Sequence, residues 1–201
     1  LIGNGHTSTS LAFALQQSGM SVISISPESI SKSKLKEFSI VLAVDHVGSP
    51  LFDKVNKNIN TSWMAIELGG VGGHTIPSVL GSISLFDSTT ACYSCLQTRV
   101  KSNLTAIEEF NSESLISISP SFESLLGSLS AYLVTFLSNS TMTHSHVFEI
   151  SDFSIEKINN ENNAITQRLL LPIPTCPSND HSSFPCLSGN VTERAEYAID
   201  E

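Results

Sequence analysis

The feature that most constrains the fold is an alternation of short apolar runs and helix-like stretches at the start of the chain. "LIGNG" has the pattern of a buried strand that enters a glycine turn, and "MSVISIS" and "SIVLAVDHV" are apolar, β-branched runs typical of two further strands. Residues 6–19 predict a helix that is capped by Thr7 or Ser8 and ended by Gly19. The polar residues 27–37 predict a second, partial helix. This order predicts a βαβαβ unit with a parallel sheet.

The remaining residues predict further elements of both kinds. Residues 49–60 are helix-like, "SWMAIEL" has the pattern of a strand, and "SISLF" predicts an antiparallel strand behind the glycine-rich stretch "GGVGGHTIPSVLG". A helix is expected to begin at "ACYSCLQTR", and apolar residues at helical spacing predict a long core helix over residues 120–138. "HVFEIS" and "ITQRLLLPIP" predict a β-hairpin. The predicted fold class is α/β and Rossmann-like: a mostly parallel sheet flanked by helices, with a C-terminal hairpin and a cysteine-containing loop.

The length of 201 residues fits one domain with a sizeable core. We expect a single domain over residues 1–201, with a Rossmann-like half at 1–88. Residues 89–201 would then hold the C-x-x-C segment, the long helix, the hairpin and a C-terminal loop. We also expect the sequence to be a piece of a longer protein.

Composition excludes some classes of partner. The chain has 10 Lys and Arg against 19 Asp and Glu, a net charge of −9, whereas nucleic-acid binding needs clustered cations. We therefore expect no nucleic-acid partner. Serines and Glu123 interrupt the apolar stretch at 120–138, which favours a buried helix over a membrane span. Four cysteines are too few for a disulfide scaffold, and we predict a cytoplasmic protein without a membrane partner.

The glycine turn is a candidate cofactor site. Its pattern Gly3-x-Gly5-x-x-Ser8 resembles the dinucleotide fingerprint G-x-G-x-x-G, whose glycines let a phosphate approach a helix N-terminus. Ser8 replaces the third glycine, and no carboxylate ends the second strand to hold a ribose. Gly3 and Gly5 are thus candidate cofactor-binding residues for NAD or ATP, and the alternative is a turn that packs helix on strand and binds nothing. No G-x-S-x-G, H-E-x-x-H or P-loop motif is present, and we identify no catalytic residue.

Cys92 and Cys95 form a C-x-x-C pair with three open interpretations: half of a zinc site, a redox pair, or two inert buried thiols. Structural zinc takes four ligands, and two further cysteines, Cys176 and Cys186, lie in a Pro-rich segment near His181. For the zinc interpretation the candidate metal ligands are Cys92, Cys95, Cys176 and Cys186, with His181 as the alternative fourth ligand.

The order of these segments resembles a known family. A Trp-containing strand in "SWMAIEL" is followed by "ACYSCLQTR", a long apolar helix, a hairpin and "LLLPIPTCP". Over nearly its whole length the chain resembles the ThiF-like (ubiquitin-activating-like) domain that partners YcaO proteins in azoline-forming cyclodehydratases. Members of that family show a "CYRCL…R" knuckle and a later "LPRCPxC" knuckle. The resemblance implies a ThiF fold and a structural zinc held by two C-x-x-C pairs, with Asn179 standing at the last cysteine of the second pair.

The resemblance also implies a role in the biosynthesis of thiazole- and oxazole-modified peptides such as bacteriocins. In that family the domain is generally a scaffold that presents the precursor peptide and activates the YcaO partner, which uses ATP. Adenylating members hold ATP with an Asp after the second strand, and "SISPES" has no Asp there.

We therefore expect a non-catalytic scaffold without ATP in this domain. Its expected partners are a precursor peptide and a YcaO domain, fused or separate, and a homodimer is compatible with the sequence. An ATP-dependent ThiF-like adenylyltransferase and an NAD-dependent Rossmann oxidoreductase are the alternatives.

Overall fold

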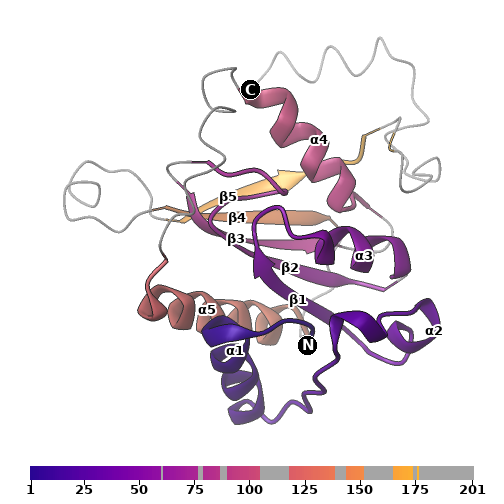
Figure 1. The fold of residues 1–201 in the computed structure, drawn as a ribbon, viewed down its shortest axis with the longest axis vertical. Coiled ribbons are helices and arrows are strands. Elements are labelled where there is room, and N and C mark those ends of the chain that lie inside the picture. The colour runs from indigo at the N-terminus through magenta and orange to yellow at the C-terminus, as the bar shows by residue number, and fades with distance from the viewer. Residues whose placement is uncertain are drawn as a thin grey trace.

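A computed structural model of the chain describes residues 1–59, 61–76, 79–86, 90–104, 118–138, 144–151, 165–173 and 176. Within these residues one sheet has the order β1 (Val41–His46), β2 (Trp63–Leu68), β3 (Val79–Phe86), β4 (Ser145–Ser151) and β5 (Ile165–Leu170). The helices are α1 (Gly5–Gln17), the 3-10 turn η1 (Pro27–Ser29), α2 (Lys32–Leu35), α3 (Pro50–Asn58), α4 (Tyr93–Asn103) and α5 (Pro120–Ser138). Figure 1 shows α1 and α5 on one face of the sheet and α3 and α4 on the other.

The sheet is mixed and mostly antiparallel, so the prediction of a mostly parallel sheet is wrong. β1 and β2 pair in parallel, whereas β2–β3, β3–β4 and β4–β5 are antiparallel pairs. A glycine-rich turn joins β2 to β3 and leaves no room for the crossover helix that a parallel pair requires. The α/β class, the antiparallel strand after the glycine-rich stretch and the β4–β5 hairpin are confirmed.

The predicted βαβαβ start is present in reduced form. Ile2 makes parallel bridges to Ile25 on one side and to Ala43 of β1 on the other, and these bridges replace the two full strands predicted there. The Ile2 N–H donates to the Leu42 carbonyl at 2.8 Å, and the Val44 N–H donates to the Ile2 carbonyl at 2.8 Å. The parallel part of the sheet therefore has the spatial order Ile25, Ile2, β1, β2.

Helix α1 begins earlier than predicted. Its N-cap residue is Asn4, and Thr7 and Ser8 lie buried within the helix, so the prediction that one of them caps it is wrong. Gly5 has a φ of 90°, a conformation that glycine adopts readily, and this lets the chain turn into the helix at once. The Ser8 hydroxyl donates to the Asn4 carbonyl at 3.1 Å from inside the first turn. Gly19 follows the end of the helix with a φ of 80°, as predicted.

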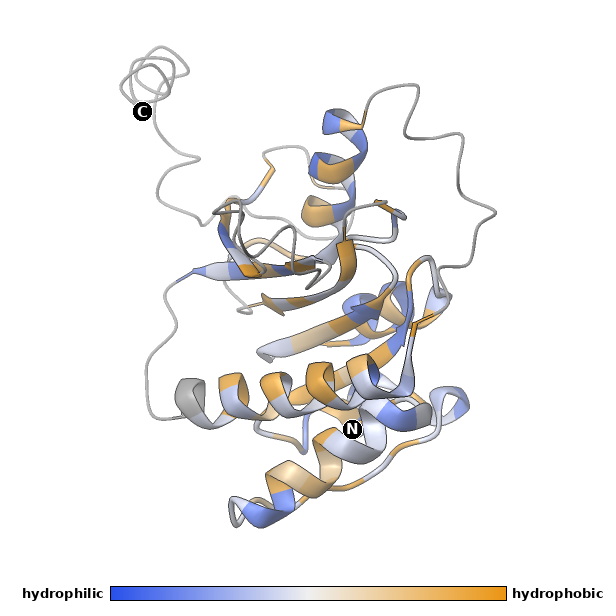
Figure 2. Cartoon of the chain, turned by 90° about the vertical axis from the view of Figure 1, so that its left-hand side faces the viewer, coloured by the Kyte–Doolittle hydropathy of each residue, from blue (hydrophilic) through white to orange (hydrophobic). Residues whose placement is uncertain are grey.

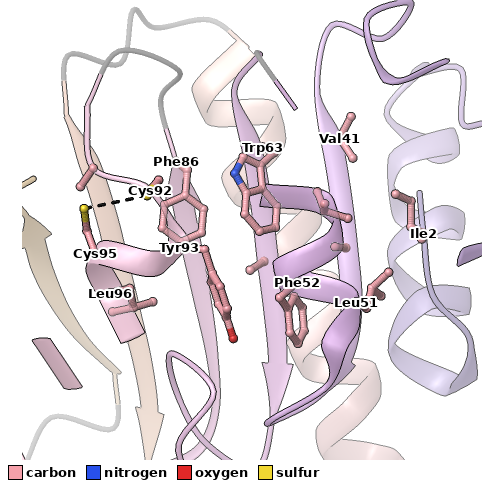
Figure 3. Close-up of a cluster of buried hydrophobic side chains, with 14 of the residues drawn as sticks. Ile2, Val41, Leu51, Phe52, Trp63, Phe86, Cys92, Tyr93, Cys95 and Leu96 are labelled. Carbon is pink, nitrogen blue, oxygen red and sulfur yellow. Dashed lines mark hydrogen bonds between the residues drawn. The ribbon is translucent and has the colours of Figure 1, made fainter. Parts of the chain in front are cut away.

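Two hydrophobic cores lie on opposite faces of the sheet. The core under α3 and α4 contains aromatic rings whose neighbouring centroids are 4.8 to 6.0 Å apart. These rings belong to Phe52, Trp63, Phe86 and Tyr93 (Figure 3). The core under α1 and α5 includes Leu11, Ile66 and Leu126, and Figure 2 shows hydrophobic residues recurring along α5.

The long helix α5 is a core helix, as predicted. Phe122, Leu126 and Val134 are buried in the core that it shares with α1 and the sheet. Across the described parts of the chain, no helix combines the length and apolarity needed to cross a membrane.

Helices α1 and α5 touch at Gly127. A Cβ atom added at this glycine would lie 2.5 Å from the Thr7 carbonyl oxygen and 3.0 Å from the Leu11 backbone nitrogen. Both neighbours are backbone atoms of α1, so they can move away only if the whole helix moves. The absent side chain therefore sets the distance between the two helices.

We predict that Gly127→Ala lowers the free energy of unfolding by about 1–3 kcal/mol, because the added methyl group forces α1 and α5 apart. Urea unfolding followed by circular dichroism measures the change. Ser128→Ala, at an exposed position of the same helix, is the control and is expected to change stability by less than about 0.5 kcal/mol. Equal midpoints for the Gly127 variant and the unmodified chain would contradict the packing argument.

Candidate metal centre

Three cysteines from two distant segments meet beside α4. Cys92 is the N-cap residue of α4, Cys95 lies in its first turn, and Cys176 follows β5. The Cys92 Sγ lies 3.9 Å from the Cys95 Sγ and 3.4 Å from the Cys176 Sγ, and all three sulfurs lie within 4.8 Å of one another. Cys92 and Cys95 are buried and Cys176 is half-buried (Figure 3 shows the first two). Three of the four predicted ligands are thus brought together.

These distances fit a tetrahedral metal centre. Zinc binds thiolate sulfur at about 2.3 Å, which places neighbouring sulfurs of a tetrahedral site about 3.8 Å apart. The sulfur–sulfur distances of 3.9 and 3.4 Å lie on either side of that value. The Ile173 N–H also donates to the Cys95 Sγ at 3.4 Å, a contact that orients a ligand sulfur. The cluster of Cys92, Cys95 and Cys176 could therefore hold a metal such as zinc.

The structure shows three candidate ligands and no fourth among the residues that it describes, since no further His, Cys, Asp or Glu there joins the three sulfurs. The predicted fourth ligand Cys186, the alternative His181 and the position Asn179 all lie outside the described residues. Their participation stays a prediction.

The raised pKa of the Cys95 thiol links metal binding at this cluster to the release of protons. The hydrogen bond with Cys92 raises the pKa of the Cys95 thiol, and burial raises it further. Without a cation the Cys95 thiol therefore keeps its proton at neutral pH. A divalent metal binds thiolate, so metal uptake at this site is expected to release protons and to weaken as the pH falls.

Hydrogen bonds from α3 determine where α4 begins. The Cys92 carbonyl accepts the Cys95 N–H at 3.0 Å, but the Cys92 side chain caps no N–H of the helix. Asn56 of α3 supplies the cap instead, because its Oδ1 accepts the Tyr93 N–H at 3.1 Å. Its Nδ2 donates to the Ser94 Oγ at 3.3 Å. The buried Asn56 amide therefore leaves the Cys92 thiol available to the cluster.

Arg99, the last residue of "ACYSCLQTR", holds the segment that leads to Cys176. Its Nε donates to the Leu171 carbonyl at 3.1 Å and its Nη2 donates to the Pro172 carbonyl at 3.4 Å. The Cys176 N–H in turn donates to the Ile173 carbonyl at 3.1 Å. Polar contacts with the backbone thus bring the third sulfur to α4.

The buried side chain of Glu67 in β2 supports the start of α4 from the sheet. Glu67 of β2 is 0% exposed. Its Oε2 accepts the Gly72 N–H at 2.6 Å, and its Oε1 accepts both the Gly73 N–H and the Tyr93 O–H at 2.8 Å. Gly72 and Gly73 have φ values of 59° and 79°, as a tight hairpin turn with both central residues in the left-handed region requires.

Burial raises the pKa of the Glu67 carboxyl above its ordinary value, and the hydrogen bonds from Gly73, Tyr93 and Gly72 offset only part of that rise. Burial, followed by the charge of Glu67, raises the pKa of Tyr93. The phenol therefore stays neutral and keeps its proton to donate to the carboxylate.

The glycine turn at the start of the chain has a packing role. A Cβ atom at Gly3 would lie 2.2 Å from the Val44 carbonyl oxygen, so the segment can approach β1 only as glycine. A Cβ atom at Gly5 would lie 3.6 Å from Oε2 of Glu123 in α5. This carboxylate supplies negative charge at the N-terminus of α1, where a phosphate would otherwise be favoured. Cofactor binding by Gly3 and Gly5 stays a prediction, and the charge of Glu123 argues against a phosphate there.

No protein-family model, curated protein or solved structure matches the chain. The resemblance to ThiF-like domains stays a prediction.

Sequence reasoning missed three residues that organise the site. Glu67 had a signal, because it is the one charged residue in the apolar run "SWMAIEL" and a glycine-rich stretch follows it. Arg99 ends the segment "ACYSCLQTR", but its backbone partners are remote in sequence. Asn56 could not be distinguished from the other asparagines of the chain.

We predict that Arg99→Ala weakens zinc binding about tenfold, because the segment that carries Cys176 is no longer held against α4. Competition with a chromophoric chelator measures the affinity. Lys101→Ala removes an exposed charge from the same helix and is the matched control. Equal zinc affinities for the Arg99 variant and the unmodified chain would contradict this role.

Proposed function

We propose that the chain is a non-catalytic, ThiF-like scaffold domain of a YcaO-type cyclodehydratase system and that a structural zinc stabilises it. In this proposal the domain docks a precursor peptide and activates the YcaO partner. The partner then carries out ATP-dependent azoline formation on the peptide backbone.

The meeting of "ACYSCLQTR" and "LLLPIPTCP" at one cluster is the observation that carries the proposal. Cys92 and Cys176 are separated by 84 residues, yet their sulfurs lie 3.4 Å apart. In the ThiF-like family, zinc joins two cysteine segments. Membership of this chain would therefore require these two segments to meet in the fold. Arg99 strengthens the argument, because the final residue of the first motif contacts the backbone that precedes Cys176.

The zinc of this proposal is structural. Cys92, Cys95 and Cys176 would hold it, Cys186 would complete the four-thiolate set, and His181 is the alternative. Bound zinc would cross-link α4 to the chain after β5 and would stabilise the folded state directly.

The surroundings of the Gly3–Gly5 turn support a domain that binds no nucleotide and performs no catalysis of its own. Both alternatives, an ATP-dependent adenylyltransferase and an NAD-dependent oxidoreductase, need a nucleotide phosphate at the N-terminus of α1. Glu123 lies beside Gly5 at that point, and its carboxylate would repel the phosphate. The proposal therefore assigns the turn to packing of α1 against β1.

We predict about one zinc per purified chain, and loss of that zinc in Cys92→Ser, Cys95→Ser and Cys176→Ser. Elemental analysis measures the content, and thermal unfolding with and without a chelator measures the stabilisation. Cys186→Ser should also lose zinc while His181→Asn keeps it; the reverse result would make His181 the fourth ligand. A folded sample without zinc, with a thermal midpoint that a chelator does not change, would contradict the structural metal.

We predict that calorimetry detects no micromolar binding of ATP or NAD to the isolated chain. Combined with a YcaO protein and its precursor peptide, the chain should raise the rate at which the peptide loses water, as followed by mass spectrometry. A reaction that proceeds equally fast without the chain would count against the scaffold role. Micromolar ATP binding would instead favour the adenylyltransferase, and micromolar NAD binding the oxidoreductase.

A further inference from the structure

The carboxylate of Glu67 is surrounded by hydrogen-bond donors. The Gly72 N–H reaches one oxygen, and the Gly73 N–H and the Tyr93 O–H reach the other, at 2.6, 2.8 and 2.8 Å. A glutamine at this position would offer one acceptor oxygen, and its NH2 group would face a backbone N–H donor. The site therefore favours a side chain with two acceptor oxygens, although the residue is completely buried.

Tyr93 connects this carboxylate to the metal centre. It lies between Cys92 and Cys95 in the sequence and forms the first residue of α4. Its hydroxyl is held by Glu67 and its backbone N–H by Asn56, at 2.8 and 3.1 Å. Its ring is packed among Trp63, Phe86 and Phe52, as Figure 3 shows. A displacement of Tyr93 would therefore move the backbone of both neighbouring ligands.

The glycine turn that Glu67 holds also contacts α4. A Cβ atom at Gly72 would lie 2.9 Å from the Leu96 Cγ, and one at Gly73 would lie 3.1 Å from the Gln97 Nε2. The turn thus lies against the residues that directly follow Cys95. Glu67 supports α4 twice, through the Tyr93 hydroxyl and through the turn.

We propose that Glu67 and Tyr93 are positioning residues of the metal site. Their hydrogen bond sets the orientation of the first turn of α4 and, with it, the separation of the Cys92 and Cys95 sulfurs. This inference rests on the proposed zinc site and adds to it two residues that bind no metal themselves. Residues that orient metal ligands from outside the coordination sphere commonly change metal affinity by about 10- to 100-fold when they are replaced.

The test compares Tyr93→Phe, Glu67→Gln and the double variant with the unmodified chain. Each protein is titrated with Co²⁺, whose absorption spectrum reports the geometry of its thiolate ligands, and its Zn²⁺ affinity is measured by chelator competition. We expect each single variant to bind Zn²⁺ about 10- to 100-fold more weakly and to shift the Co²⁺ bands. Because both variants alter one hydrogen-bonded network around the Glu67 side chain, the double variant should lose less than the product of the two single effects.

Ile66→Val is the matched control. Ile66 lies on β2 next to Glu67 but belongs to the core on the opposite face of the sheet. This variant weakens the fold without touching α4, so it should leave the Zn²⁺ affinity and the Co²⁺ spectrum unchanged. An equal loss of affinity in this control would attribute the effect to stability in general and overturn the positioning role.

The test distinguishes failure of the metal site from failure of the positioning role alone. If the unmodified chain binds neither Co²⁺ nor Zn²⁺, the metal centre itself fails and the positioning role fails with it. If it binds them and Tyr93→Phe has unchanged affinity and spectrum, the positioning role alone is overturned. Should Glu67→Gln not fold, Tyr93→Phe carries the test, since it keeps the ring and removes one hydroxyl. If neither variant folds at saturating Zn²⁺, the contact is a requirement of the fold and the inference is overturned.

Discussion

A carboxylate without access to water determines much of the arrangement around the cysteines. Burial of a charged group is costly unless hydrogen bonds compensate it, and Glu67 accepts three of them. The donors belong to the turn after β2 and to the first residue of α4. One side chain of the central sheet therefore ties a glycine hairpin and the cysteine-bearing helix to a single position.

The contact between α4 and the chain after β5 has a different physical character. Besides apolar packing of Ile173 and Cys176 against the core below α4, it includes two Arg99 hydrogen bonds to backbone carbonyls, an N–H to sulfur bond and the approach of three sulfurs. Closing a loop of 84 residues costs conformational entropy, and hydrogen bonds at a partly exposed surface offset little of it. A metal ion bound by the three thiolates would supply a much stronger cross-link at the same place.

The metal centre and the scaffold role, which together make up the proposed function, rest on different observations. The candidate metal centre is supported by the sulfur distances and by the polar contacts that place the three cysteines. The scaffold role depends on a family resemblance in two short segments, together with the carboxylate of Glu123 beside the turn where a nucleotide would bind. A Rossmann-like start with a glycine turn does not by itself imply a nucleotide, because the same glycines are needed for backbone approach to β1.

The sequence by itself determined the elements whose signal is local: the core helix at 120–138, the strand "SWMAIEL", the hairpin β4–β5 and the pairing of Cys92 with Cys95 on one helix turn. Periodicity and turn residues suffice for these. It also selected Cys176 as a distant partner. Only the tertiary structure decided strand direction after β2, the start of α1 at Gly5, and the roles of Glu67, Asn56 and Arg99. Those depend on contacts between segments far apart in the chain, and such contacts leave no periodic pattern in the sequence.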